Sequence, residues 1–127
     1  MSKQLRALLL SAGLGTRLRP ITNTIPKCLV EIDGQPILDR WLNQLESVGC
    51  EAALINTHYL SKKVYKFLEK RANKSMLVHT VHEPLLLGTA GTFQSNFKFF
   101  EDKTGLLIHS DNATSLDLKN LLEAHHN

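Results

Sequence analysis

The chain has 127 residues, of which 43% are hydrophobic and 21% are charged, and its formal net charge is +3. This length and composition are ordinary for a globular protein, so we expect one domain over residues 1–127. The charge is small and evenly spread, with no run of lysines and arginines among aromatics, which argues against nucleic acid and favours small anionic substrates.

No stretch of the sequence approaches the length of an apolar membrane span, so we expect no membrane partner. The first four residues lead directly into a predicted strand rather than into a signal peptide, which favours a cytoplasmic location. Cys28 and Cys50 lie far apart in the sequence and lack the spacing of a metal site. We therefore expect reduced thiols rather than a disulfide or a zinc site.

Strand and helix patterns alternate along the chain without a linker or a repeat. Residues 3–11 end in a continuous apolar stretch, which is typical of a strand buried on both faces. From Pro36, apolar residues recur on one helical face until Gly49 ends the helix. Phe93, Phe97 and Phe100 also recur at helical spacing, and we expect them in the core. The predicted strands are 3–11, 51–56, 76–81 and 105–109; the predicted helices are 37–48, 61–72, 89–100 and one that starts near Ser115.

Four strands separated by helices predict an α/β fold with right-handed crossovers, namely a three-layer α/β/α, Rossmann-like parallel sheet. With the first strand central, the loop that follows it meets the loop after the fourth strand. This is a topological switch point, where open α/β sheets bind ligands.

The loop after the first strand contains two glycines and is followed by two cations. Gly13 and Gly15 let the backbone approach a ligand closely, so that consecutive N–H groups can point at phosphate oxygens. Arg17 and Lys27 add positive charge. The prolines that flank residues 21–25 are expected to keep this segment extended and to hold Lys27 over the loop. The pattern predicts a site for a nucleoside triphosphate.

Two other glycine motifs bind nucleotides, and the sequence departs from both. The dinucleotide fingerprint needs a small residue where this chain has Leu18 and a helix where it has Pro20, although Asp33 lies at the distance expected for a ribose contact. A P-loop ends in Gly-Lys-Ser/Thr, whereas here Gly15 precedes Thr16-Arg17. The remaining alternative is an ordinary turn with scattered surface cations.

Asp111 follows the fourth predicted strand at the same edge of the sheet. A carboxylate at this position is well placed to hold Mg²⁺ between itself and triphosphate oxygens. The alternative is that Asp111 caps the turn before the next helix, and Asn112 is equally well explained as a turn residue.

The run from Leu8 to Ile37 (LLLSAGLGTRLRPITNTIPKCLVEIDGQPI) closely resembles the signature of the sugar-1-phosphate nucleotidyltransferases. Glu83 to Gly91 (EPLLLGTAG) and Leu107 to Asn112 (LIHSDN) match the family in order and spacing. The sequence is most similar to mannose-1-phosphate guanylyltransferases and glucose-1-phosphate thymidylyltransferases. The resemblance implies transfer of a nucleotidyl group from a nucleoside triphosphate to a sugar 1-phosphate, releasing pyrophosphate, with GTP and mannose 1-phosphate as the favoured pair.

The resemblance also implies roles for individual residues. Arg17 would bind the departing β- and γ-phosphates, Lys27 would bridge the phosphates of donor and acceptor, and Mg²⁺ on Asp111 would fix the α-phosphate. Glu83 would either read an exocyclic amino group of the base or simply close the strand before Pro84. The implied nucleotide-binding set is Leu10, Ala12, Gly13, Gly15, Thr16, Arg17, Lys27, Glu83 and Gly88.

Members of this family normally continue well past the equivalent of residue 127, with further strands, sugar-contacting loops and a second metal-binding aspartate. We therefore expect the chain to represent the amino-terminal half of the family fold, with an incomplete sheet whose edge favours self-association. The alternative function is a nucleotide-binding module or subunit without turnover. Ser110 stands where the family usually has glycine, and its side chain has the potential to crowd the α-phosphate.

Overall fold

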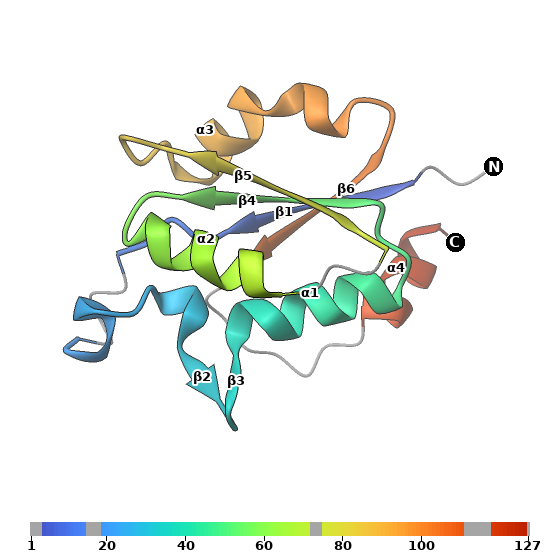
Figure 1. The fold of residues 1–127 in the computed structure, drawn as a ribbon. Helices are drawn as coiled ribbons and strands as arrows, with labels where there is room; N and C mark the ends of the chain where they lie inside the picture. Colours follow the sequence, from blue (N-terminus) through green and yellow to red (C-terminus); the bar gives the residue numbers. More distant parts are fainter. Residues whose placement is uncertain (1–3, 15–18, 72–74, 111–117, 127) are drawn as a thin grey trace.

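The structure is a computed structural model that describes residues 4–14, 19–71, 75–110 and 118–126. Its centre is a four-stranded parallel sheet in the order β5-β4-β1-β6 (Figure 1). This order confirms the predicted parallel α/β sheet with the first strand between the second and the fourth. The strands are β1 (Leu5–Leu10), β4 (Ala52–Thr57), β5 (Leu77–His82) and β6 (Thr104–His109).

Helices cover both faces of this sheet and make three layers (Figure 1). The helices are α1 (Ile37–Ser47), α2 (Ser61–Lys70), α3 (Gly88–Ser95) and α4 (Leu118–His126). Three short 3₁₀ turns accompany them: η2 (Ile21–Asn23), η3 (Lys27–Leu29) and η4 (Phe97–Phe100). Within the described residues, no helix is long and apolar enough to cross a membrane.

The first helix ends where the sequence predicts, through a paired hydrogen-bond motif. Gly49 has a φ of +76°, a conformation that glycine adopts without a steric cost. The N–H of Gly49 donates to the carbonyl of Glu46 at 3.1 Å, and the N–H of Cys50 donates to the carbonyl of Leu45 at 3.0 Å. This is the Schellman arrangement, which turns the chain sharply into β4.

The larger core lies between the sheet and α1 and α2, because alternate residues of β1 point to that face. Leu5, Ala7 and Leu9 of β1 pack there with the buried face of α1. The opposite face carries a smaller core around Leu8 and Phe100 beneath α3 and η4. The buried core on the side of α1 and α2 is therefore larger than the core on the side of α3.

The prediction that three phenylalanines of one helix lie in the core is wrong for two of them. Phe100 is 6% exposed, whereas Phe93 is 39% and Phe97 is 56% exposed. The predicted helix over 89–100 is broken, because α3 ends at Ser95 and a 3₁₀ turn begins at Phe97. The rings still contact one another, with centroids 6.2 Å apart for Phe93 and Phe97 and 5.3 Å apart for Phe93 and Phe100. The three phenylalanines therefore share one face, of which only the Phe100 end is buried.

The segment after the glycine loop is also less extended than expected. Residues Ile21–Asn23 form a 3₁₀ turn, in which the N–H of Asn23 donates to the carbonyl of Pro20 at 3.0 Å. The buried Thr22 is held by the hydroxyl of Tyr59, which donates to the Thr22 carbonyl at 2.7 Å. This contact anchors the segment to the loop after β4.

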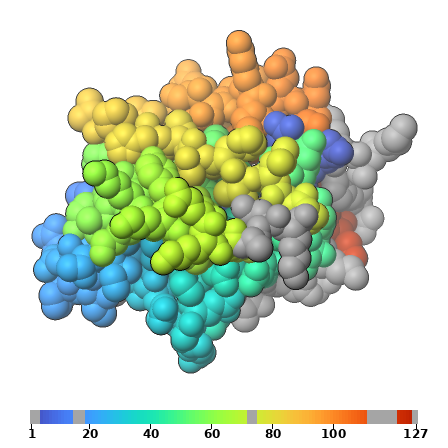
Figure 2. Space-filling view, viewed as in Figure 1, coloured from blue at the N-terminus to red at the C-terminus, as the bar shows by residue number. Residues whose placement is uncertain are grey.

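A two-residue hairpin turn follows this segment and projects from the lower edge of the molecule (Figure 2). Strands β2 (Glu31–Ile32) and β3 (Gln35–Pro36) are joined by Asp33 and Gly34, with φ values of +54° and +78°. Two positive φ angles are typical of a type I′ turn, which Asp-Gly favours. Asp33 therefore occupies a hairpin tip, which gives no support to a dinucleotide-type ribose contact.

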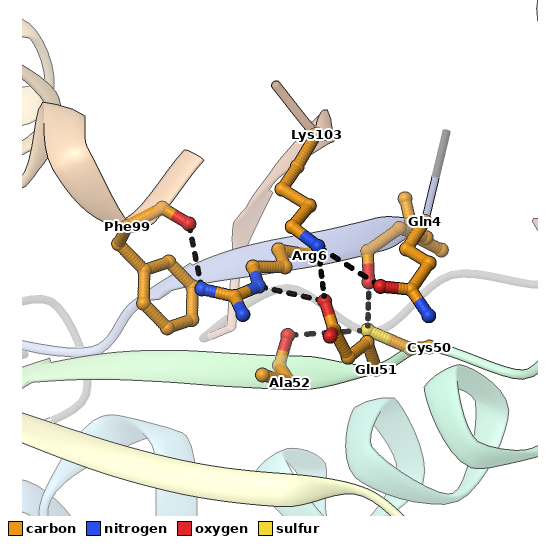
Figure 3. Close-up of polar contacts among 8 residues, drawn as sticks. Gln4, Arg6, Cys50, Glu51, Ala52, Phe99 and Lys103 are labelled. Atoms are coloured by element: carbon orange, nitrogen blue, oxygen red, sulfur yellow. Dashed lines mark hydrogen bonds and ion pairs between the residues drawn. The ribbon is translucent and has the colours of Figure 1, made fainter. Parts of the chain in front are cut away.

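Charged and thiol side chains cluster at the amino ends of the central strands (Figure 3). Glu51 accepts a hydrogen bond from Arg6 Nε at 2.8 Å and lies 3.3 Å from Lys103 Nζ. Arg6 also donates to the Phe99 carbonyl at 3.0 Å and lies over the Phe99 ring. The hydrogen bond from Arg6 lowers the pKa of Glu51, whereas burial raises the pKa of the neighbouring free Cys50 thiol to about 11.

The lowered pKa of Glu51 makes stability depend on pH at this edge. A carboxylate whose pKa is lower in the folded than in the unfolded chain stabilises the fold above its unfolded value of about 4.5, and this contribution is lost as the pH falls through the folded value. We expect Glu51→Gln to lower the melting temperature at pH 7 and to flatten its decline below pH 4.5. Thermal melts from pH 3 to pH 7 measure this. Glu69→Gln, at an exposed site on α2, is the control, and identical pH profiles for Glu51→Gln and the parent would contradict the assignment.

Candidate functional site

A cavity of about 220 Å³ opens at the carboxyl ends of the central strands. Leu10 of β1 pairs in register with Asn56 of β4 and with His109 of β6, so these residues lie at one level of the sheet. The position is the predicted switch point, where β1 and β6 are neighbours in the sheet although they are not consecutive in the chain. The lining residues are Leu10, Ala12, Gly13, Asn56, Glu83, Leu86, Gly88, Thr89, Thr92 and His109.

Two walls of this cavity come from distant parts of the sequence. The first, the glycine wall, consists of Leu10, Ala12 and Gly13 at the end of β1. The second, the helix wall, consists of Leu86, Gly88 and Thr89 at the start of α3. Five residues of the implied nucleotide-binding set line the cavity together, and their contacts with a nucleotide stay a prediction: Leu10, Ala12, Gly13, Glu83 and Gly88.

The other implied site residues are placed differently. Lys27 is half-buried at the start of η3, directly after the buried Pro26, and it is not among the residues that line the cavity. Gly15, Thr16, Arg17 and Asp111 lie outside the described residues, so their roles also stay predictions.

The helix wall depends on a glycine. Gly88 has a φ of +75°, and no heavy atom lies within 4 Å of the position where a Cβ would stand. Backbone strain rather than lack of space therefore favours glycine here. Gly88 is the first residue of α3, whose free N–H groups and dipole favour a negative charge near this end.

A buried polar network that the sequence did not indicate joins the two walls of the cavity. Glu83 is 3% exposed, and its Oε2 accepts hydrogen bonds from Thr92 Oγ1 at 2.5 Å and from Asn56 Nδ2 at 3.3 Å. Asn56 Oδ1 accepts the N–H of Ser11 at 2.6 Å. The one sign of this network in the sequence is that a polar residue stands at the end of an apolar strand. The sequence does not show which side chain such a residue contacts.

Glu83 also extends the sheet beyond β5. Its N–H donates to the Thr57 carbonyl at 2.7 Å, and its Oε1 accepts the N–H of Leu87 at 3.4 Å. The carboxylate thus ties β4, the end of β5 and the start of α3 together. This geometry agrees with the strand-closing alternative for Glu83, and a contact with the base remains a prediction.

Two serines join the ends of the strands that carry the two loops. The Ser110 hydroxyl donates to the Leu10 carbonyl at 3.0 Å and shares a hydrogen bond with the Ser11 hydroxyl. Ser110 is fully buried and does not line the cavity. Its side chain therefore points to the neighbouring strand end, which speaks against the expected crowding of a ligand.

The predicted Mg²⁺ ligand Asp111 follows the described end of β6 in the sequence and lies outside the described residues. The N–H of Ser110 donates to the Leu10 carbonyl at 3.2 Å, so the end of β6 lies beside Leu10 of the glycine wall. The next residue in the sequence is Asp111. A carboxylate is the ligand type that Mg²⁺ prefers. Among the described residues, no three His, Cys, Asp or Glu side chains gather as a metal-binding group.

The family model described as nucleotidyl transferase matches residues 6–127. The chain belongs to this family. A mannose-1-phosphate guanylyltransferase catalytic subunit beta from Drosophila pseudoobscura pseudoobscura is 34% identical over 125 residues, which cover 96% of this chain and 34% of that protein. An N-acetylmuramate alpha-1-phosphate uridylyltransferase from Caulobacter vibrioides is 43% identical over 70 residues, or 55% of this chain and 29% of that protein.

A solved structure of HddC from Yersinia pseudotuberculosis complexed with GMP-PN matches this chain with a TM-score of 0.79 and 29% identity. The match covers 94% of this chain and 53% of that chain. The chain thus spans about a third of the two relatives above and about half of HddC. The resemblance to sugar-1-phosphate nucleotidyltransferases and the Rossmann-like parallel sheet are both confirmed.

The serine pair beneath the loops generates a prediction about stability. Ser110→Ala removes one buried hydrogen-bond donor, and such a bond is worth about 1 kcal/mol. We expect a fall of a few degrees in the melting temperature, measured by thermal unfolding followed by circular dichroism. Ser75→Ala, at an exposed serine before β5, provides the matched control with no expected change. A melting temperature equal to that of the parent would show that the Ser110 hydroxyl contributes nothing.

Proposed function

We propose that the chain carries the nucleotide-binding site of an enzyme that transfers a nucleotidyl group from a nucleoside triphosphate to a sugar 1-phosphate. The observation that carries this proposal is the cavity at the switch point, where the glycine wall faces the helix wall. Both walls come from the segments that carry the family's sequence motifs. The family match over residues 6–127 supports the same reaction class.

The reaction is an in-line displacement at the α-phosphorus of the triphosphate. A phosphate oxygen of the sugar 1-phosphate forms the new bond, and the bond to the β-phosphate breaks as pyrophosphate leaves. The attacking phosphate is already ionised, so the protein must supply alignment and charge neutralisation rather than a general base. In this proposal Arg17 holds the leaving phosphates and Lys27 bridges donor and acceptor.

Asp111 would hold Mg²⁺ at the end of β6. When bound, the ion neutralises phosphate charge and polarises the α-phosphate for attack. The support is that Asp111 follows Ser110 in the sequence, and Ser110 is bonded to the Leu10 carbonyl through its N–H and its hydroxyl.

For the base we favour guanine, with mannose 1-phosphate as the acceptor. The support is that one relative is a mannose-1-phosphate guanylyltransferase and that the HddC structure contains GMP-PN. The base would meet the backbone of Leu10 and Ala12 on one side and Gly88 on the other. The two buried cysteines are not joined in a disulfide, which agrees with a reducing location, and we place the activity in the cytoplasm.

The alternative function is nucleotide binding without turnover, as a module or subunit. The observation that favours it is the outer edge of β6, which pairs with no other strand of the described chain. Leu107 on β6 is 43% exposed beside the exposed aromatics of α3 and η4. Such an apolar sheet edge favours self-association, which light scattering over a range of protein concentrations would detect.

Thermal-shift measurements with the four nucleoside triphosphates and Mg²⁺ test the binding step. A ligand at a hundred times its dissociation constant stabilises a protein by about 2.7 kcal/mol, so binding should raise the melting temperature clearly. Pyrophosphate release with a panel of sugar 1-phosphates then separates an enzyme from a binding module. No stabilisation by any triphosphate would contradict the proposal.

We expect Lys27→Ala to weaken triphosphate binding while leaving the fold intact, because a lysine ammonium supplies charge to phosphates and little packing. Loss of one such contact should raise the dissociation constant about tenfold. Calorimetric titration with GTP and Mg²⁺ measures this, and Lys66→Ala on α2 is the control with an exposed lysine. Equal affinities for the Lys27→Ala variant and the parent would remove Lys27 from the site.

Asp111→Asn keeps the shape of the side chain and removes its negative charge. We expect Mg²⁺-dependent triphosphate binding to fall, whereas binding measured with EDTA should change less. Two calorimetric titrations, with and without the ion, give the comparison. If the variant and the parent gain equally from Mg²⁺, Asp111 is a turn residue and not a metal ligand.

A further inference from the structure

One buried amide in the lining of the cavity contacts both segments that form its walls. Asn56 is 4% exposed and lies near the end of β4. Its Oδ1 accepts the N–H of Ser11 at 2.6 Å, and Ser11 stands between Leu10 and Ala12 of the glycine wall. Its Nδ2 donates to Glu83 Oε2 at 3.3 Å and, over a longer 3.5 Å, to Thr92 Oγ1 on the side of the helix wall.

The directions of these hydrogen bonds require an amide. Thr92 Oγ1 donates its proton to Glu83 Oε2 at 2.5 Å and is therefore free to accept from Asn56 Nδ2. Turning the amide round would set its NH₂ group against the N–H of Ser11 and its oxygen against the Glu83 carboxylate. Only a side chain that accepts on one end and donates on the other satisfies both neighbours.

We propose that Asn56 is a positioning residue that holds the glycine wall and the helix wall at the separation needed to grip one nucleotide from both sides. This inference rests on the proposed function, namely that the cavity binds a nucleoside triphosphate. Hydrogen bonds in such a buried network are strong because the local dielectric constant is low. A displacement of about 1 Å in a binding geometry costs as much as a hundredfold in function, so a small change in wall separation has a measurable effect.

Two ligands that contact different walls of the cavity can test this role of Asn56. Inorganic tripolyphosphate presents only phosphates, whereas GTP also presents a base and a ribose to the second wall. Disturbing the link between Asn56 and the helix wall should therefore weaken GTP binding and spare tripolyphosphate binding. A merely structural role would lower the melting temperature and leave the ratio of the two affinities unchanged.

The test is calorimetric titration of the 127-residue chain with GTP and with tripolyphosphate, each in the presence of Mg²⁺. Asn56→Asp keeps the acceptor for Ser11 but sets a second carboxylate against Glu83. We expect its dissociation constant for GTP to rise about tenfold or more, and that for tripolyphosphate to stay within about twofold. Thr92→Val, which leaves Asn56 in place, should weaken GTP binding in the same selective way by about threefold or more.

Thr92→Ser keeps the hydroxyl and should restore GTP affinity to within about twofold of the parent. Thr80→Val, at an exposed threonine on β5, is the matched control and should change neither affinity. If circular dichroism shows that Asn56→Asp does not fold, the two affinities of Thr92→Val provide the test instead. Selective loss of GTP binding supports the inference.

Equal weakening of both ligands by Thr92→Val, or of neither, overturns the inference and leaves the proposed function standing. Failure of the parent chain to bind either ligand overturns the proposed function and this inference with it. Binding of tripolyphosphate as tightly as GTP by the parent shows that the helix wall takes no part, and it overturns the inference alone.

Discussion

The parallel pairing of β1 with β4 on one side and with β6 on the other is the constraint on which the rest of the structure depends. Parallel strands end at the same edge of a sheet, so this pairing brings the carboxyl ends of β1 and β6 together. The helices that connect the strands lie on both faces of the sheet (Figure 1), and the cavity opens at the carboxyl ends of the strands. The cavity is therefore a consequence of strand order rather than of any single side chain.

A buried polar network then fixes the positions of the residues that line the cavity. Asn56, Glu83 and Thr92 come from β4, the end of β5 and α3, and each is less than 5% exposed. Burying these groups costs free energy unless their hydrogen bonds are made, and here they satisfy one another. The same bonds that stabilise the buried carboxylate also fix the start of α3 relative to β1. Stability and site geometry thus rest on the same few groups.

The sequence predicted the strands and the first two helices well, because each has a strong local signal. The apolar run of β1 and the glycine after α1 are examples, since either can be recognised without knowledge of the fold. The prediction that Phe93 and Phe97 are buried was wrong, because helical spacing predicts a common face but does not show whether another element covers that face. Asn56 and Thr92 were missed because a polar residue in sequence does not reveal its partner. The positions of Arg17 and Asp111 remain predictions.

The central claim is that a nucleoside triphosphate binds between the glycine wall and the helix wall. Backbone amide shifts in an NMR titration of the chain with GTP and Mg²⁺ test this most directly, because they report each wall separately. The account predicts that Gly13, Gly88 and Thr89 respond together and saturate at one ligand concentration. Shifts that are absent from these residues, or that gather instead around Tyr65 and Thr80 on the side of α2 and β5, would contradict it.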